Sequence, residues 1–268
     1  MPELPEVETV VRTLERMIGG RTVTGVTVRY PKIIEGDPAE FEQQLKNQTF
    51  REFERRGKYL IFRMTYCTLV CHLRMEGKFY VMDPSEPLTR HMHIVFDLDD
   101  GSQLRYNDTR KFGRMEIFPL DTDFSRFRNL GPEPFDETYT GAYVKAYARS
   151  RNTPLKTMLL DQSFTAGIGN IYADEILFAS HLRPGRNCHR ITNADAAAIA
   201  DNTRTILRRA ILAGGTTIRS YTSSLGVTGL FQNDCMVHEQ KICRICSSTI
   251  KMKRIGGRSS YYCPQCQK

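Results

Sequence analysis

A chain of 268 residues is long enough for more than one hydrophobic core, and 40% hydrophobic and 25% charged residues are ordinary for a globular protein. No apolar run reaches membrane-spanning length, and the N-terminus has no basic region followed by an apolar stretch, so we expect neither a membrane protein nor an exported one. The formal net charge of +8 favours a polyanionic partner. Eight cysteines in an unexported chain argue against a disulfide framework.

The opening stretch, MPELPEVETV, predicts the first helix. Apolar side chains from Val7 to Ile18 recur at helical spacing and form one stripe. Pro5 suits the first turn of this helix, and the early glutamates suit the positive end of its dipole. Gly19 and Gly20 are expected to end it.

Residues 22–120 have the pattern of short strands separated by turns rich in Gly, Pro or Asp, with a hairpin predicted at DLDDGSQL. Many short strands at close spacing are typical of an antiparallel sandwich or barrel. The stretch NLGPEPFDETYTG that follows has the composition of a linker.

The pattern becomes helical from Thr153 to about Gly214. In TPLKTMLLDQ, Thr153 is the expected cap and Pro154 the first helical residue. A helix is expected at NIYADEILFASHL, and a long one starts near Asn193 and ends before Gly214. We therefore predict an α+β multidomain protein: residues 1–131 form an N-terminal helix and antiparallel β-sandwich, 132–225 a helical domain and 226–268 a cysteine module.

Four cysteines near the C-terminus have the spacing of a metal site. They form two CxxC pairs separated by 16 residues: Cys243, Cys246, Cys263 and Cys266. This spacing matches one tetrahedral four-thiolate zinc ion, which leaves no open ligand position and is therefore structural.

Two further segments are candidates for phosphate contacts. Between the cysteine pairs, STIKMKRIGGRSSYY predicts a β-hairpin that turns at Gly256 and Gly257 beside Arg258, and a rigid basic tip suits a phosphate or a groove. In AGIGN, Asn170 is expected to cap the next helix. Whether that turn only caps a helix or also offers amides to a phosphate stays open from the spacing alone.

The first residues allow covalent chemistry. Removal of the initiator methionine would leave Pro2 with a secondary α-amine, which is deprotonated at neutral pH more often than a lysine. Such an amine can attack a sugar carbon and form a cationic imine, while Glu3 transfers protons. Alternatively, Pro2 and Glu3 only begin a helix.

Taken together, six motifs in this order resemble the bacterial formamidopyrimidine-DNA glycosylase family over essentially the whole chain. They are MPELPEVETV, RRGKYLIF, HLRMEGKF, DTRKFG, DQSFTAGIGNIYADE and CRIC…GGRSSYYCPQC. The resemblance implies an N-terminal helix with a two-sheet β-sandwich, a helix–two-turn–helix domain and a C-terminal zinc finger. It also implies base-excision repair of damaged double-stranded DNA: removal of oxidised purines, such as 8-oxoguanine and formamidopyrimidines, followed by β,δ-elimination at the abasic site.

Site residues follow from the same resemblance. It makes Pro2 the Schiff-base nucleophile, Glu3 the acid/base, and Lys58 and Arg258 catalytic residues that also grip phosphates. The DNA-binding residues that it implies are Lys58, Met75, His91, Arg110, Phe112, Lys156, Asn170 and Arg258. The resemblance also implies lesion contacts at Glu76, Ser220 and Thr222.

Base flipping explains the apolar members of this set. A duplex hides the sugar carbon, so the enzyme must extrude the nucleotide, and inserted side chains such as Met75 and Phe112 offset part of the unstacking cost. Both lie beside polar turns that contain Gly, which favours exposure over core packing. Thr109 in DTRKFG departs from the proline or apolar residue of many family members, and this affects only the turn.

Three other functions compete with this one. An endonuclease VIII-type glycosylase, which prefers oxidised pyrimidines, typically begins PEGPE, whereas this chain has PELPE. A non-catalytic zinc protein that binds nucleic acid needs neither a Pro2 amine nor Glu3. A zinc-ribbon adaptor leaves the motifs that carry Met75 and Phe112 unexplained. We expect a monomer in the bacterial cytoplasm, associated with the nucleoid.

Overall fold

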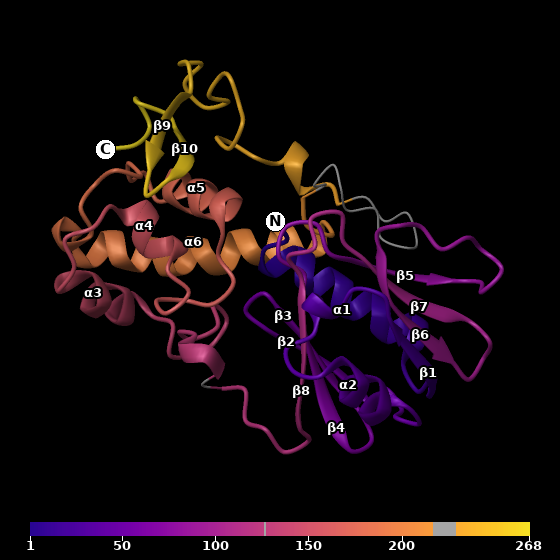
Figure 1. Ribbon diagram of the computed structural model, residues 1–268. Helices are drawn as coiled ribbons and strands as arrows, with labels where there is room; N and C mark the ends of the chain where they lie inside the picture. The colour runs from indigo at the N-terminus through magenta and orange to yellow at the C-terminus, as the bar shows by residue number, and fades with distance from the viewer. Residues whose placement is uncertain (126, 217–228) are drawn as a thin grey trace. The chain divides into compact units, whose positions relative to one another are not determined.

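The computed structural model describes residues 1–125, 127–216 and 229–268 (Figure 1). These divide into two compact units. Unit 1 comprises Met1–Ser125 with Thr216 and Gly229, and unit 2 comprises 127–215 and Leu230–Lys268. The cysteine module thus belongs to the same compact unit as the helical segment, and the division into three domains stays a prediction.

Within its described residues, unit 1 contains two α-helices and two antiparallel four-stranded sheets, with strand orders β1-β6-β7-β5 and β2-β3-β4-β8. Its elements are α1 (Leu4–Ile18), β1 (Val23–Val28), α2 (Pro38–Leu45), β2 (Glu52–Arg56), β3 (Tyr59–Arg63), β4 (Cys67–His72), β5 (Lys78–Met82), β6 (Met92–Leu98), β7 (Gln103–Asn107) and β8 (Arg114–Pro119).

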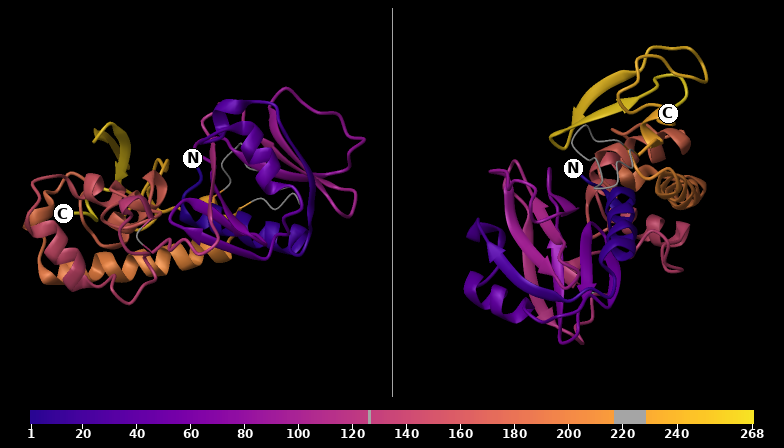
Figure 2. Two further views of the ribbon diagram at one scale, coloured as in Figure 1. Left: turned by 60° about the horizontal axis from the view of Figure 1, so that its bottom comes forward. Right: turned by 90° about the vertical axis from the view of Figure 1, so that its right-hand side faces the viewer.

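One hydrophobic core joins these two sheets and both helices. It includes Leu14 of α1, Phe41 of α2, Phe62 of β3 and Phe96 of β6, all 3% exposed or less. Alternate residues of several strands enter this core, for example Cys67, Leu69 and Cys71 of β4, which is the pattern of two sheets packed face to face. The predicted β-sandwich is confirmed, and Figure 2 shows its two layers.

The first helix forms as predicted and buries its apolar stripe on the core. Pro5 lies in the first turn, where its missing N–H costs no hydrogen bond, and Gly19 is the C-cap. The hairpin at DLDDGSQL is also confirmed, since it joins β6 to β7.

The strand-rich region contains one helix that the strand pattern did not predict, α2. The side chain of Asp37 accepts hydrogen bonds from the N–H groups of Ala39 and Glu40, and Pro38 occupies the first turn. These are helix-start signals. They were missed because only Phe41 and Leu45 are buried, too few for a clear period.

The part of unit 2 that the structure describes contains four α-helices and a two-stranded hairpin. They are α3 (Gly141–Arg149), α4 (Leu155–Leu160), α5 (Asn170–Ala179), α6 (Asn193–Leu212), β9 (Lys251–Ile255) and β10 (Arg258–Tyr262). The helix α3, capped by Thr140, was not predicted. The hairpin lies over α5, and α6 runs beside α3 and α5 (Figure 1).

Two predicted helix starts are each wrong by one residue. Pro154 is the N-cap of α4 rather than its first helical residue, because its ψ of 146° is extended. Similarly, Gly169 is the extended N-cap of α5, so Asn170 is the first helical residue and not the cap. In the described residues, no helix is both long and apolar enough to cross a membrane.

Candidate active site and zinc module

The N-terminus of unit 1 is surrounded by charged groups. Burial is the largest influence on the Met1 amine and lowers its pKa, an effect that Glu3, Glu6 and Glu76 oppose and that Lys58 reinforces. The structure therefore brings three of the predicted site residues, Glu3, Lys58 and Glu76, around the start of the chain. Glu3 is 2% exposed and Lys58 is 7% exposed.

A hydrogen-bond network fixes this start of the chain. Glu6 accepts a hydrogen bond from the N–H of Glu3 at 2.8 Å. Its other oxygen accepts from the N–H and the hydroxyl of Thr216, at 2.8 and 3.1 Å. The sequence analysis missed Glu6, which is 2% exposed and ties the first turn of α1 to a residue 210 positions later.

The turn that carries Arg110 and Phe112 is built around the fully buried carboxylate of Asp108. This carboxylate accepts hydrogen bonds from the N–H groups of Arg110, Phe112 and Gly113 at 2.8–2.9 Å. Lys111 has a φ of 59°. The side chain of Phe112 is 47% exposed and lies under the guanidinium of Arg110, 4.8 Å from the ring centroid. Both side chains therefore project from a rigid turn.

The turn that carries Met75 packs on the same internal side chain as the Asp108 turn. A Cβ on Gly77 would lie 2.3 Å from the hydroxyl of Tyr106, and one on Gly113 would lie 1.7 Å from it. Only glycine allows both turns to approach this hydroxyl. Met75 is half-buried, so the predicted exposure holds in part.

His91 lies beside the Asp108 turn, since its carbonyl accepts a hydrogen bond from the N–H of Asp108 at 3.0 Å. Its Nδ1 is buried and has no partner among the described residues. The loop between β5 and β6, which leads to His91, is also held from inside the protein. The buried guanidinium of Arg105 donates hydrogen bonds to the carbonyls of Asp83, Pro84 and Glu86.

In unit 2, the AGIGN turn is held from inside. Gln162 accepts a hydrogen bond from the N–H of Gly167 and donates to the carbonyl of Ile168. The ammonium of Lys156 donates to the carbonyl of Asn170 at 2.8 Å. The buried Oδ1 of Asn170 has no partner within the described part of the chain, which is unusual for a buried polar atom unless another molecule completes the site.

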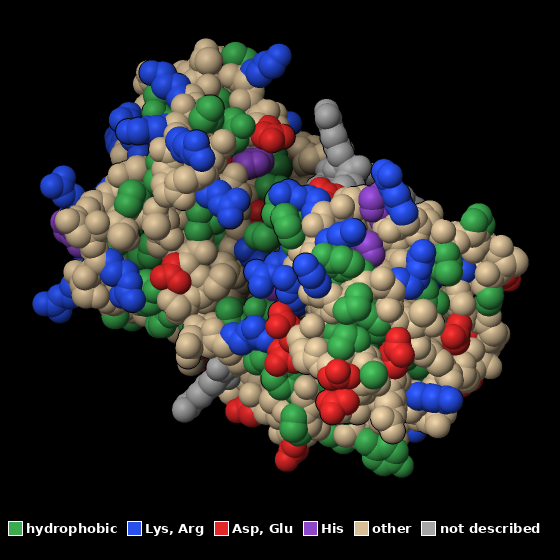
Figure 3. Space-filling model, viewed as in Figure 1, with side chains coloured by type: hydrophobic (Ala, Val, Ile, Leu, Met, Phe, Trp, Pro, Cys, Tyr) green, Lys and Arg blue, Asp and Glu red, His purple; other side chains and the backbone are tan. Residues whose placement is uncertain are grey.

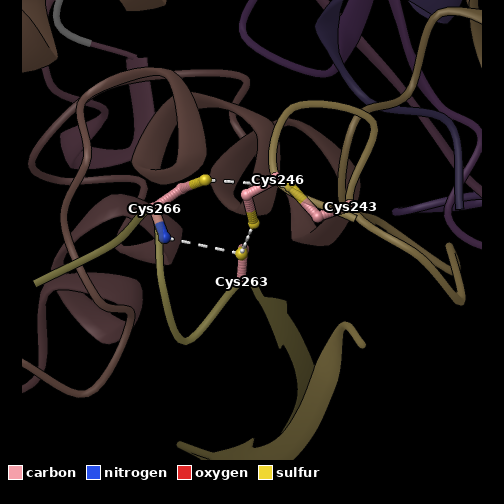
Figure 4. Close-up of side chains that lie close together, drawn as sticks. All are labelled: Cys243, Cys246, Cys263 and Cys266. Carbon is pink, nitrogen blue, oxygen red and sulfur yellow. Dashed lines mark hydrogen bonds between the residues drawn. The ribbon is translucent and has the colours of Figure 1, made fainter. Parts of the chain in front are cut away.

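The four cysteines converge on one point (Figure 4). Their sulfurs lie within 4.8 Å of one another, with 3.8 Å between Cys243 and Cys266 and 3.4 Å between Cys246 and Cys263. Zn–S bonds of about 2.3 Å in a tetrahedron place sulfurs about 3.8 Å apart, so the donor set fits one structural zinc ion. Hydrogen bonds with Ser248 lower the pKa of Cys246 to about 6 and favour the thiolate that zinc binds.

The predicted hairpin forms between the cysteine pairs. Gly256 and Gly257 have φ values of 55° and 78°, which suit a tight turn and disfavour other residues. Arg258 is exposed at the start of β10. On the face shown in Figure 3, Lys and Arg side chains are scattered over both units, whereas most of the acidic side chains lie over unit 1.

Three family models match successive parts of the chain. They are the formamidopyrimidine-DNA glycosylase N-terminal domain over residues 1–115, the H2TH domain of the same enzymes over 130–222, and a zinc finger found in FPG and IleRS over 241–268.

Full-length relatives carry the same name. The formamidopyrimidine-DNA glycosylase of Bacillus licheniformis is 42% identical, and that of Oceanobacillus iheyensis is 40% identical. Each alignment covers 100% of this chain, and 100% and 98% of the relative respectively. The chain belongs to the formamidopyrimidine-DNA glycosylase family.

Solved structures of this family have the same fold. A Lactococcus lactis FPG mutant in complex with Fapy-dG containing DNA superimposes with a TM-score of 0.95 at 34% identity, with 100% of both chains covered. The Lactococcus lactis Fpg with an abasic site containing DNA gives 0.94, with 99% of both chains covered.

Membership of the glycosylase family does not test the individual residue roles, which stay predictions. Lys156 is the member of the set that the structure places deepest, since its side chain is fully buried in an ion pair with Asp174. A buried Lys156 can influence DNA binding only through the residues it contacts, such as Asn170. Ser220 and Thr222 lie outside the described residues.

The residues that hold these turns were not predicted from the sequence. Asp108 is the first residue of the DTRKFG motif, and an Asp before a short turn is itself a signal, because its carboxylate can bind the following N–H groups. Asp174 and Glu175 gave no such signal, since two adjacent acids in a helix are usually exposed.

Substituting Asp108 tests whether its carboxylate holds the turn that carries Arg110 and Phe112. Asp108→Ala leaves three backbone N–H groups without their acceptor, each costing about 1–3 kcal/mol when buried. We expect the free energy of unfolding in urea to fall by about 3 kcal/mol or more. Asp100→Ala is the control, because Asp100 caps an exposed turn. An equal loss in both variants contradicts the assignment.

Removing the metal tests the cysteine site. We expect Cys263→Ser to lower zinc content to near zero and to weaken DNA binding, because the hairpin with Arg258 loses its anchor. Metal analysis and a binding assay measure both effects. Cys235→Ser, at a buried thiol outside the cluster, is expected to keep both. Full zinc loading of the Cys263 variant would rule out the four-thiolate site.

Proposed function

We propose that this chain removes oxidised purines, 8-oxoguanine and formamidopyrimidines, from double-stranded DNA and then cuts the strand at the abasic site by β,δ-elimination. The observation that carries the proposal is the group of Glu3, Lys58 and Glu76 around the half-buried amine of Met1, in a chain of this family. Related structures support the substrate class, since two of them are complexes with Fapy-dG containing DNA and with abasic site containing DNA.

The N-terminal amine acts as nucleophile once Met1 has been removed. The nitrogen of Pro2 bonds to the sugar C1′ and loses its proton, while the bond from C1′ to the base breaks and the departing base takes up a proton. The C1′–O4′ bond then opens with a proton transferred to O4′, which gives an iminium that accepts electrons during strand cleavage. Burial lowers the pKa of the Met1 amine, and desolvation favours the neutral form of any amine that is buried at this end of the chain. Glu3 supplies a proton to the sugar or the departing base.

Basic and apolar side chains deliver the nucleotide to this amine. Lys58, Asn170 and Arg258 bind phosphates beside the lesion, while Met75 and Phe112 occupy the space that the flipped base leaves. The exposure of Phe112 on a rigid turn supports this role. The positive charge of the chain attracts the duplex without regard to sequence.

The pyrimidine-specific alternative is not favoured. Both the N-terminal family model and the full-length relatives carry the name of the formamidopyrimidine enzyme. We also propose a monomer that works on the bacterial nucleoid in the cytoplasm. The bacterial origin of the relatives supports the setting.

Borohydride trapping tests the proposed chemistry. We expect a covalent adduct with an 8-oxoguanine duplex, linked through Pro2, and much less with an oxidised-pyrimidine duplex, because borohydride reduces the iminium to a stable amine. Mass spectrometry of the intact protein and of its N-terminal peptide locates the link. Protein that retains Met1 serves as the control, since its Pro2 nitrogen is an amide and forms no adduct. If protein whose mature N-terminus is Pro2 forms no adduct, the proposal is wrong.

Glu3→Gln tests the proton transfer. We expect the rate of base excision in single-turnover assays to fall by about 10²-fold or more, because a positioned general acid typically contributes that much. The matched control is Glu8→Gln on the same helix, where Glu8 pairs with Arg12 and Arg55. The control is expected to change the rate by less than about threefold, since pairs of this kind are worth roughly 1 kcal/mol or less. Similar rates for the two variants would remove Glu3 from the mechanism.

A further inference from the structure

Two adjacent buried acids on α5 hold the segment that leads into the zinc module. Glu175 accepts hydrogen bonds from the N–H groups of Met236, Val237 and His238 at 2.8–3.0 Å. Its side chain is 3% exposed. The backbone of residues 236–238 is thereby fixed against α5, and it presents the His238 side chain to the neighbouring acid, Asp174.

Asp174 lies between two cationic or donor groups. One oxygen accepts from the ammonium of Lys156 at 2.5 Å, and the other lies 2.7 Å from Nδ1 of His238. Asp174 and Lys156 are fully buried, and the side chain of His238 is 11% exposed. Because an ionised carboxylate only accepts hydrogen bonds, Nδ1 of His238 must carry a proton and donate it.

The chain of contacts continues to the candidate phosphate-binding turn. Besides Asp174, the ammonium of Lys156 donates to the carbonyl of Asn170, the first residue of α5. The position of the Lys156 ammonium therefore depends on the Asp174 carboxylate, which also binds His238. A hydrogen bond from His238 orients the carboxylate, and the carboxylate then orients the ammonium under Asn170.

The hairpin that carries Arg258 contacts the same network. The ring of His238 meets the ring of Tyr261 on β10 edge to face, with 5.1 Å between centroids. On α4, Thr157 follows Lys156, and its hydroxyl lies 2.9 Å from where a Cβ on Gly256 would be. Both phosphate-binding elements of unit 2 thus rest on α4 and on His238.

We infer that His238 is a positioning residue for DNA binding. Through Asp174 and Lys156, it holds the Asn170 turn in the conformation that binds a phosphodiester beside the lesion. The inference rests on the proposed role of Asn170 in phosphate binding. No part of it requires His238 to touch DNA.

Two substitutions distinguish the hydrogen bond that Nδ1 of His238 donates from the contact that its ring makes with Tyr261. Asn places an amide nitrogen where His has Nδ1, so His238→Asn keeps the donor and loses the aromatic contact with Tyr261. His238→Phe keeps a ring against Tyr261 and loses the donor. His238→Ala is a second variant without the donor, and His189→Phe, at an exposed histidine of unit 2, is the matched control.

The test measures the Kd of full-length, zinc-loaded protein for a duplex with a tetrahydrofuran abasic analogue, which the enzyme does not cleave. We expect His238→Phe to weaken binding about tenfold, or about 1.4 kcal/mol. His238→Asn and His189→Phe should change the Kd by less than about threefold, which is below about 0.7 kcal/mol. Zinc content and Tm are measured for every variant, so that loss of the module is recognised.

Combining variants shows whether His238 acts through Asn170. In an Asn170→Ala background, His238→Phe should weaken binding by less than about twofold, because the turn no longer depends on its support. The inference is overturned if the effect is equally large in both backgrounds, or if Asn and Phe at position 238 are equally harmful. If Asn170→Ala alone leaves the Kd unchanged, the role of Asn170 in the proposed function fails as well. A normal Kd for His238→Phe with a weakened Asn170→Ala overturns only the role of His238.

Discussion

The carboxylate of Asp108 accepts hydrogen bonds from the N–H groups of three residues of one turn, and the side chains of Arg110 and Phe112 on that turn are exposed. A turn that is to meet DNA cannot satisfy its backbone N–H groups with its own exposed side chains, since those are needed for the ligand. It must be satisfied from within the protein, where a single ionised oxygen can bind more than one donor. Such a buried charge is tolerated only because its hydrogen bonds replace the water that it has lost.

The same solution recurs elsewhere in the described chain. Glu6 binds the start of α1 and Thr216, and Glu175 binds three N–H groups ahead of the zinc module. In each case a buried acid organises backbone next to a predicted contact with DNA. A chain with a net charge of +8 therefore keeps part of its negative charge inside, where it shapes the surface without repelling phosphates directly.

The elements predicted correctly from the sequence have local signals. The stripe of α1, the glycines of the β9–β10 hairpin and the spacing of the cysteines each depend on residues close in the chain. The helix α2 was missed because its start signals were brief, and α3 because it adjoins a linker-like stretch. The family resemblance was predictable because several motifs occur together in a fixed order.

The supporting side chains could not be predicted, because their partners are distant in sequence. His238 and Asp174 are 64 positions apart, and Glu6 and Thr216 are 210 apart. No period or spacing reports such a pair. The burial of Lys156 was also invisible, because a lysine near the surface and one in an ion pair look identical in the sequence.

The hydroxyl of Tyr106 has a consequence for how this protein can change. Because Gly77 and Gly113 both pack on it, the Met75 turn and the Phe112 turn share one internal contact. A larger residue at either glycine displaces the tyrosine and so disturbs the other turn. Lengthening or randomising one turn in order to alter the damage that is recognised therefore has a cost at the second turn. At Gly113 a side chain needs an accommodating change at position 106, and at Gly77 it would also meet the carbonyl oxygen of Leu73 at 2.6 Å. The two turns are therefore best regarded as a single unit of variation.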